Sequence, residues 1–503
     1  HDTVRRQRQM CIRDRAVTLT DTTGTIQFDG ALTATDLNTA AKGYGVSLLG
    51  GSTIANAVTF SNTGTTQIGD ATGDTNTFNG GVTATAGAVT ASGSVVTSED
   101  NLALGAVTLV EAQTLTLDTA NTGGGNITVA SLTGVTGGSS ENITLESGSG
   151  TITVSGAVGT DIGTLTLQEN AAGASGAVSL QGNVAANTLT TFAQAYDVSL
   201  TGAVNSITNA VTFSNTGTTQ IGDATGDTNT FNGGVTATAG AVTASGSVVT
   251  SEDNLALGAV TLVEAQTLTL DTANTGGGNI TVASLTGVTG GSSENITLES
   301  GSGTITVSGA VGTDIGTLTL QENAAGASGA VSLQGNVAAN TLTTFAQAYD
   351  VSLTGAVNSI TTDTTFLNTG AITVGDESTD SSTFAGGLDT TAGGTENFAG
   401  TVAATDNQID IGVASVTADA TIDGGTGAIN TAALTVADAS TLTVGTGAVG
   451  APTIASVTGA NGGGAASNLT LNSTGVASVG AVGTNIGTAV SYTHLRAHET
   501  ESN

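Results

Sequence analysis

The sequence contains an exact internal repeat, because residues 56–208 recur without a single change as residues 209–361. A block that can follow itself with every side chain unchanged is typical of architectures built by stacking. A third, diverged copy covers residues 362–489, and residues 16–55 form the end of a degenerate repeat. The identical pair reflects either a recent duplication or a fault of sequence assembly.

A short pattern recurs throughout the chain: an apolar residue, then Thr or Ser, then another apolar residue. Strict alternation predicts strands with one buried face and a hydroxyl on the other. Gly, Asn, Asp and Ser fill the gaps between these strands, and no segment shows a helical period with caps. We expect the threonine in the middle of each triplet to face outward. The apolar residues on either side of it should lie inside: Ile127, Val129, Ile152, Val154, Leu165 and Leu167.

Several strands run into a glycine that is followed by a second apolar residue, as at Gly156, Gly182 and Gly202. Glycine adopts backbone conformations that other residues avoid, and it often marks a bend in a strand. We expect these glycines to permit the corner at which the chain turns to its next face.

The diverged copy tests how the strands are arranged. Asp376 matches Asp223 at an offset of 153 residues, but Leu442 matches Leu268 at an offset of 174. The difference of 21 residues is close to one solenoid coil of roughly 20 to 25 residues. A solenoid can gain a whole coil, whereas a β-sandwich would lose a strand pairing. We therefore predict an all-β fold, a right-handed parallel β-helix (β-solenoid) of about twenty coils.

The two ends of the chain differ from the rest in composition. Arg5, Arg6, Arg8, Arg13 and Arg15 crowd the first 15 residues, and all three histidines and the only Cys also lie at the ends. Residues 1–15 and 490–503 resemble translated sequencing adaptors, so we interpret them as foreign and exclude them from fold reasoning. A basic N-terminal arm that binds nucleic acid is the alternative. On the first interpretation, the chain is a segment of a longer protein.

The body of the chain is strongly acidic. All but four of the 40 acidic residues lie between the two ends, where Lys42 is the only basic residue. This balance excludes nucleic acid and anionic lipid as electrostatic partners. No run approaches the roughly 20 apolar residues of a membrane span, so we expect no membrane insertion by this segment. The acidic residues either keep a repetitive β-protein soluble or gather divalent cations.

Paired acidic residues are the metal-binding candidates. Asp70 and Asp74 lie four residues apart and recur as Asp223 and Asp227, and in diverged form as Asp376 and Asp380. Carboxylates and turn carbonyls suit Ca²⁺, which is the one cofactor that the sequence suggests. The spacing matches neither the EF-hand loop nor the nonapeptide of Ca²⁺-binding β-rolls. The alternative is that these residues only shape a turn at a coil corner.

Other candidate sites have a simpler structural explanation. Six phenylalanines recur at matching apolar places and indicate core aromatics rather than a carbohydrate platform: Phe60, Phe78, Phe213, Phe231, Phe366 and Phe384. Tyr44, Tyr196 and Tyr349 fit either the core or the surface. Residues 445–450 spell the Gly-rich fingerprint of dinucleotide folds, but a strand pattern follows where that fold needs a helix.

The body offers little for catalysis, because it contains no His, Cys or Arg beyond the ends. Nucleophile-and-base triads and arginine-assisted chemistry are therefore excluded. A carboxylate pair for glycoside hydrolysis stays formally open, but the repeats show neither long inserted loops nor clustered aromatics. We predict that the protein is not an enzyme.

The Val-Thr-Leu-x-Gly-x-Val coils, the turns rich in Gly, Asn and Thr and the cysteine-free body resemble bacterial β-strand-repeat surface proteins, of the filamentous-haemagglutinin and autotransporter adhesin kind. The resemblance covers residues 16–489 and implies a structural or adhesive stalk that is extracellular or on the outer cell surface. Its partner would be a surface ligand such as a carbohydrate or a host or cell-surface protein. The alternatives are a passive Ca²⁺- or ice-binding solenoid, which flat Thr ranks would favour, and a polysaccharide-active β-helix enzyme.

Overall fold

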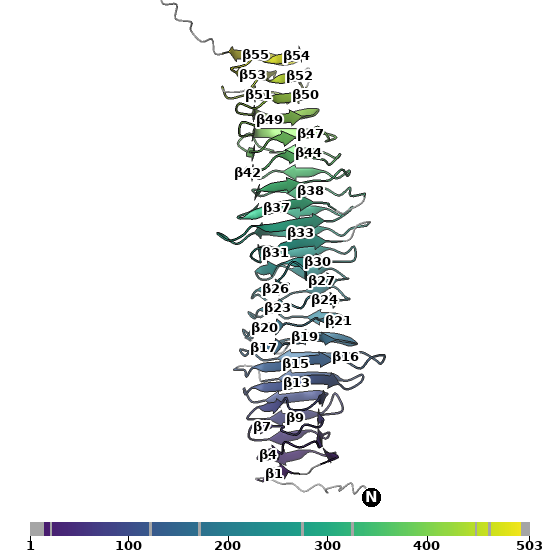
Figure 1. The fold of residues 1–503 in the computed structure, drawn as a ribbon. Coiled ribbons are helices and arrows are strands. Elements are labelled where there is room, and N and C mark those ends of the chain that lie inside the picture. The colour runs from purple at the N-terminus through teal and green to yellow at the C-terminus, as the bar shows by residue number, and fades with distance from the viewer. Residues whose placement is uncertain are drawn as a thin grey trace, which may run out of the picture. The chain divides into compact units, whose positions relative to one another are not determined.

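The computed structural model describes residues 15–20, 23–119, 123–169, 173–272, 276–322, 326–447, 450–460 and 464–493. The chain divides into two compact units, His1–Val249 and Thr250–Asn503. Both units consist of short strands joined by turns and loops, and the described residues form no helix (Figure 1). The coils make a parallel β-solenoid of about 21 turns, which confirms the predicted fold class. The right-handed winding stays a prediction.

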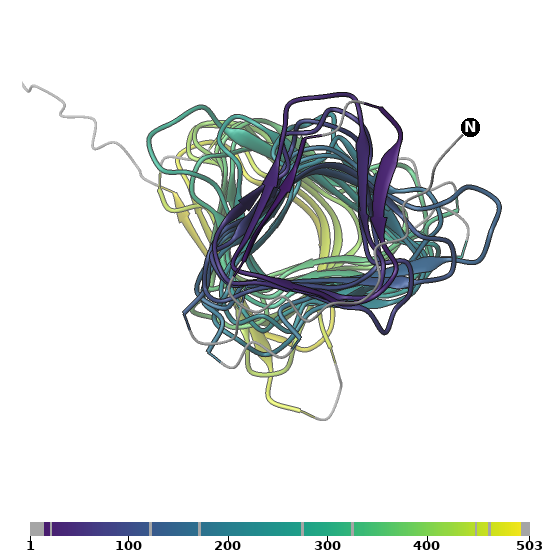
Figure 2. The same ribbon diagram turned by 90° about the horizontal axis from the view of Figure 1, so that it is seen from below.

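In the first unit, each coil is three-sided and its strands stack into three parallel walls (Figure 2). The first wall contains β3 (Leu32–Ala34), β6 (Ser52–Ile54), β9 (Thr75–Phe78), β12 (Gly93–Thr97), β14 (Thr114–Asp118), β16 (Glu141–Glu146), β19 (Ile162–Leu167) and β22 (Thr188–Thr190). The second wall contains β2 (Thr25–Phe28), β5 (Gly45–Leu48), β8 (Thr66–Ile68), β11 (Val89–Ala91), the second halves of β13 (Leu102–Leu109) and β15 (Ile127–Thr133), β18 (Val158–Gly159), β21 (Ala185–Ala186), β24 (Val204–Ile207), β27 (Thr228–Phe231) and β30 (Gly246–Val249). The third wall contains β7 (Val58–Thr59), β10 (Val82–Ala84), the first halves of β13 and β15, β17 (Ile152–Val154), β20 (Val178–Leu180), β23 (Val198–Leu200), β26 (Thr219–Ile221) and β29 (Val242–Ala244). Beside these walls, β1 (Ala16–Leu19) pairs with β4 (Asp36–Thr39), and β25 (Val211–Thr212) pairs with β28 (Val235–Ala237).

The second unit is built from the same kind of coil. One of its parallel ladders runs through β31 (Leu255–Leu262), β33 (Ile280–Thr286), β35 (Ile305–Val307), β38 (Val331–Leu333), β41 (Val351–Leu353), β44 (Ile372–Val374), β47 (Glu396–Ala403), β49 (Ala414–Asp423) and β50 (Ile429–Val436). Its other strands are β32 (Thr267–Asp271), β34 (Glu294–Glu299), β36 (Val311–Gly312), β37 (Ile315–Leu320), β39 (Ala338–Ala339), β40 (Thr341–Thr343), β42 (Val357–Ile360), β43 (Thr364–Thr365), β45 (Ser381–Phe384), β46 (Leu388–Asp389), β48 (Ile409–Ile411), β51 (Thr441–Val444), β52 (Thr453–Gly459), β53 (Ser467–Ser473), β54 (Ser478–Val482) and β55 (Ile486–Thr493).

Alternation along each strand decides which side chains form the core. Ile127, Val129, Ile152 and Val154 are all 0% exposed, as are Leu165 and Leu167, whereas Thr128, Thr153 and Thr166 face outward. The register pairs Ile127 with Ile152 and then Val178, so apolar side chains stack on their equivalents in the next coil. The predicted strands and their orientation are confirmed.

Three glycines at corners between strands, Gly156, Gly182 and Gly202, serve close stacking rather than an unusual backbone conformation. Gly156, Gly182 and Gly202 do not have a positive φ. A Cβ on Gly182 would lie 2.2 Å from the carbonyl carbon of Gly156, and one on Gly202 would lie 2.4 Å from the carbonyl oxygen of Gly182. These glycines lie at the expected corners, and they are needed there because backbones of successive coils approach each other.

The inserted coil that the offset predicted is present in the second unit. In the first copy, β12 pairs directly with β14. In the diverged copy, β47 pairs with β49, and β49 then pairs with β51, which is the counterpart of β14. Strand β49 thus adds one turn, and the neighbouring pairings continue on either side of it.

The repeat length does not equal a whole number of turns. Within the first unit, β9 lies in the first wall, but the identical strand β27 lies in the second wall. Likewise β8 lies in the second wall and its identical counterpart β26 in the third. Each strand of the repeat therefore moves to the neighbouring wall in the next copy.

Of the two ends interpreted as foreign, residues 1–14 and 494–503 lie outside the described residues. Residues 490–493 form the end of β55, where Val490 pairs with Thr470 and Tyr492 with Asn472. The solenoid pairing thus continues into the first residues of the C-terminal segment.

Two glycines on successive coils give a matched test of close stacking. We expect Gly182→Ala to destabilise its coil by about 1–3 kcal/mol, because the added methyl overlaps the backbone of Gly156. Gly159→Ala is the control, since its Cβ would make an ordinary contact of 3.7 Å with the Ala185 side chain. Hydrogen exchange of the peptides around each site measures the effect. Equal protection in the two variants would contradict the stacking argument.

Candidate functional site

The predicted Ca²⁺ pairs lie in tight turns between two strands. Asp74 Oδ2 accepts the backbone N–H groups of Asp70 at 2.9 Å and Ala71 at 3.0 Å. The same bonds recur at Asp227, from the amides of Asp223 and Ala224, and at Asp380, from those of Asp376 and Glu377. The second aspartate of each pair therefore closes its turn, as the structural alternative expected.

The first aspartate of each pair lies beside the second carboxylate. Partial desolvation raises the pKa of Asp70, and its contact with the negatively charged Asp74 raises it further. Desolvation and the neighbouring carboxylate raise the pKa of Asp223 and Asp376 in the same way. A cation between the two carboxylates would relieve this repulsion.

Each turn supplies few metal ligands. Among the described residues, no group of three or more His, Cys, Asp or Glu side chains is placed to hold a metal ion. Ca²⁺ takes six to eight oxygens, so backbone carbonyls and water would have to complete the shell. Asp70 and Asp74 follow β8 of the second wall, whereas Asp223 and Asp227 follow β26 of the third wall. Asp70, Asp74, Asp223 and Asp227 stay predicted Ca²⁺ ligands.

The recurrent aromatic residues belong to the core. Phe60 and Phe78 meet edge to face with ring centroids 6.2 Å apart, and the equivalent pairs Phe213/Phe231 and Phe366/Phe384 repeat this geometry. All six rings are buried, so the core interpretation is confirmed.

Tyr44, Tyr196 and Tyr349 are also fully buried. The hydroxyl of Tyr44 donates to the carbonyl oxygen of Leu19 at 2.8 Å and accepts the amide of Ala40 at 2.8 Å. Tyr196 and Tyr349 make the equivalent bonds, and burial raises the pKa of both phenols. These residues fasten one coil to the next and offer no surface for a ligand.

The Gly-rich spelling at residues 445–450 does not lead into a helix. Strand β51 precedes it and strand β52 follows it. Residues 448 and 449 lie outside the described part of the chain. Without a helix N-terminus, the segment lacks what a dinucleotide fold uses to hold a pyrophosphate.

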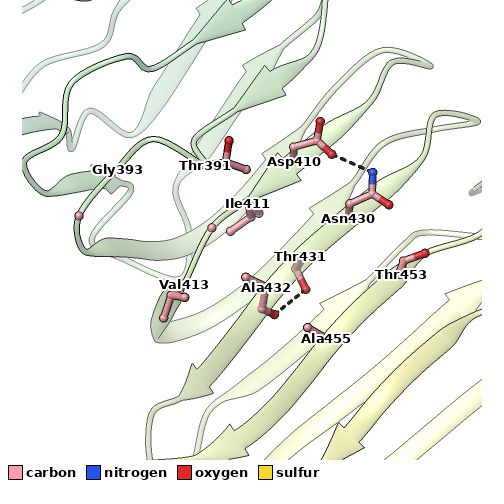
Figure 3. A pocket seen from close by; sticks show the side chains of 12 residues that line it. Thr391, Gly393, Asp410, Ile411, Val413, Asn430, Thr431, Ala432, Thr453 and Ala455 are labelled. Atoms are coloured by element: carbon pink, nitrogen blue, oxygen red, sulfur yellow. Dashed lines mark hydrogen bonds between the residues drawn. The ribbon is translucent and has the colours of Figure 1, made fainter. Parts of the chain in front are cut away.

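An open groove of about 480 Å³ runs across β48, β50 and β52 in the second unit (Figure 3). Asp410 Oδ1 accepts a hydrogen bond from Asn430 Nδ2 at 2.8 Å, and Asp410 Oδ2 accepts one from Gln408 Nε2 at 2.7 Å. The rest of the lining combines small and polar residues, such as Thr391 and Thr453, with the apolar side chains of Ile411 and Val413. The lining contains no aromatic residue, so the groove lacks a platform on which a sugar ring could stack.

A buried carboxyl lies behind the wall of this groove. Glu396 is 0% exposed, and its Oε2 accepts hydrogen bonds from Thr390 Oγ1 at 2.6 Å and from the amide of Gly412 at 3.2 Å. Burial raises the pKa of Glu396 to about 7, although the bonds from Thr390 and Gly412 lower it. Glu396 was not among the residues predicted from the sequence. No local sequence pattern marks it, because only the strand pairing shows that Glu396 occupies the slot of Val89 and Val242 in the identical copies.

Hydroxyl groups form regular ranks on the first wall of the first unit. One rank pairs Thr75, Ser94, Thr116, Thr144, Thr166 and Thr190 in register across six strands. A second polar row on the same strands pairs Thr114 with Asn142 and Thr164 with Thr188, and the register shifts between β16 and β19 at this row. An equivalent rank in the second unit pairs Thr269, Thr297, Thr319 and Thr343.

No described helix is long and apolar enough to cross a membrane. Comparison with protein-family models, with curated proteins and with solved structures found no match. The adhesin-like character of the sequence therefore stays a resemblance.

The acidic turns predict a graded response to Ca²⁺. We expect millimolar Ca²⁺ to raise the melting temperature gradually, and monovalent salt to reproduce part of the effect, because screening relieves like-charge repulsion. Asp70→Asn should reduce this response slightly, whereas Asp74→Asn should weaken the turn at every Ca²⁺ concentration, since Asp74 holds two amides. Calorimetric titration is the check. Stoichiometric binding at micromolar Ca²⁺, once per copy, would establish dedicated sites instead.

Proposed function

We propose that the protein is a structural or adhesive stalk that acts outside the cell or on its outer surface. Within each unit, the described coils share one three-sided plan, and each strand ladder passes from coil to coil. A spacer needs this uniformity, because its task is to keep two points apart.

The shift of the repeat between walls is the observation that carries the proposal. Identical residues of two copies face different sides within the first unit, as β9 and β27 show. A protein that bound a ligand through its repeats would gain from presenting them on one side. A spacer gains from stacking alone, whichever wall a strand occupies.

The acidic composition of the body favours a partner that is not strongly negatively charged. The acidic body repels nucleic acid and anionic lipid, so a carbohydrate or a host or cell-surface protein is the expected ligand. Such a ligand would be held at one part of the stalk rather than along all of it.

Removal of one repeat copy tests the stalk. A variant that lacks residues 56–208 joins Ala55 to Asn209, and we expect it to stay folded, because residues 209–361 are identical to the block removed. Small-angle scattering should show the maximum dimension shortened by about 30 Å, since each lost coil contributes about 4.8 Å. The control removes residues 56–130, which ends in the middle of a repeat and should disturb the coils at the junction. A collapsed or aggregated 56–208 variant would contradict a modular stalk.

The same preparations test the enzyme alternative. Wild type and Asp410→Asn should both release no reducing sugar from a panel of acidic and neutral polysaccharides, because the groove beside Asp410 lacks aromatic platforms. Cleavage by wild type that is lost in Asp410→Asn would contradict the stalk and would favour a polysaccharide-active enzyme.

The hydroxyl ranks on the first wall favour a second candidate, a passive ice-binding face. Hydroxyls in register repeat about every 4.8 Å between strands and about 6.6 Å along them, so they can order a layer of water. In this unit the second polar row runs beside the hydroxyl rank on β14, β16, β19 and β22, with a register shift between β16 and β19.

Inhibition of ice recrystallisation tests the second candidate. Thr144→Tyr and Thr166→Tyr would interrupt the paired ranks and abolish any inhibition shown by wild type. Thr153→Tyr is the control, because Thr153 lies on the third wall, in a single rank. Equal inhibition by the three variants, or no inhibition by wild type, would contradict the ice-binding face. The stalk would then be the only proposed function.

A further inference from the structure

The column of core residues that contains Glu396 is otherwise apolar. Parallel pairing places Glu396 between Ile372 on β44 and Ala414 on β49, and the column continues to Val351 and Leu434. The identical copies carry Val89 and Val242 in this slot. A carboxyl thus replaces a valine inside the solenoid.

The surroundings of Glu396 satisfy only half of its carboxyl. Thr390 and Gly412 donate to Oε2, while Oε1 is buried and has no hydrogen-bond partner among the described residues. A Cβ on Gly412 would lie 2.1 Å from Oε1, so the carboxyl fills the space that a side chain would need there. An oxygen enclosed in this way favours the neutral acid over the carboxylate.

Among the described residues of the second unit, none is a cation that could compensate a charge on Glu396. The second unit contains no Lys, Arg or His between residues 250 and 493. The charged group that acts on Glu396 from the preceding strand β46 is Asp389, which is negative and disfavours ionisation further. On the following strand, β48, Asp410 faces the groove and bonds to Asn430. From β44 and β49, the apolar Ile372 and Ala414 flank the carboxyl.

We propose that Glu396 is a proton-dependent latch, which keeps the segment from β46 to β49 closed when it is neutral and loosens that segment when it ionises. The carboxylate leaves the core to reach water, and the turn that carries Thr390 and the backbone at Gly412 move with it. Since solenoid stability depends on each coil and its neighbours, the loosening stays local.

The direction of the effect follows from the two protonation states. The pKa of Glu396 is about 7 in the closed form and near 4.5 when the side chain reaches water. The stabilisation of the closed segment by neutral Glu396 is therefore complete below pH 4.5. It falls as the pH rises from 4.5 to 7 and is absent above 7. Each pH unit in this window increases the opening equilibrium about tenfold, which gives roughly 300-fold in all.

Hydrogen exchange of the full chain between pH 4 and 8, corrected for the intrinsic rate at each pH, tests the latch. Peptides that cover residues 388–416 should lose protection by about two orders of magnitude as the pH rises. The peptides around Val89 and Val242 are identical in sequence, report together and serve as an internal control with no carboxyl in the slot. They should show no such change.

Three variants separate the latch from general acid repulsion. Glu396→Val restores the residue of the other copies, and Glu396→Gln keeps the shape without a titratable group, so both should make protection independent of pH. Thr390→Val should move the transition to higher pH, because the bond from Thr390 lowers the pKa of Glu396. A pH-dependent loss that persists in Glu396→Val, or that appears equally in the shared peptides around Val89 and Val242, would overturn the proposal. So would wild-type protection that does not change with pH.

Discussion

The parallel backbone ladder between successive coils is the interaction on which the rest of the structure depends. It fixes the register, so Ile127 stacks on Ile152 and Val178, and it brings outward threonines into ranks. The same close approach leaves no room for a Cβ where Gly182 and Gly202 meet the preceding coil. Core packing, surface ranks and glycine positions are all consequences of one repeated pairing, because each coil is the template for the next.

An acidic body with Lys42 as its only base has to satisfy its carboxylates in another way. Backbone amides take this role in many turns: Asp74 accepts two of them, Glu141 accepts those of Ala112 and Val135, and Asp197 accepts that of Thr218 at 2.6 Å. Such charge-assisted bonds hold turns that contain little apolar surface. Glu396 departs from this pattern, because one of its oxygens is buried without a donor. The proposed proton-dependent latch rests on that difference.

The mismatch between repeat length and coil length bears directly on function. If the repeat were a whole number of turns, Asp70 and Asp223 would share one side and could form a line of sites. Their strands β8 and β26 instead lie on different walls. Exact repetition of sequence therefore does not create a repeated binding face, which favours a spacer. The diverged copy is where singular features gather, with the inserted strand β49, the groove beside Asp410 and the buried Glu396.

Alternation and repetition were sufficient to predict a parallel solenoid, its inward residues and its extra coil, because a strand buried on one face shows that face in every second residue. The phenylalanines could be placed in the core for the same reason, since they occupy apolar strand positions. The sequence did not predict on which of the three walls each strand lies, because this depends on the number of residues that every loop contains before the next corner. Glu396 was missed because its burial follows from pairing with Ile372 and Ala414, which are distant in sequence. The roles of Gly182 and the buried tyrosines likewise came only from the tertiary structure, since contacts between coils decide them and no local pattern records those contacts.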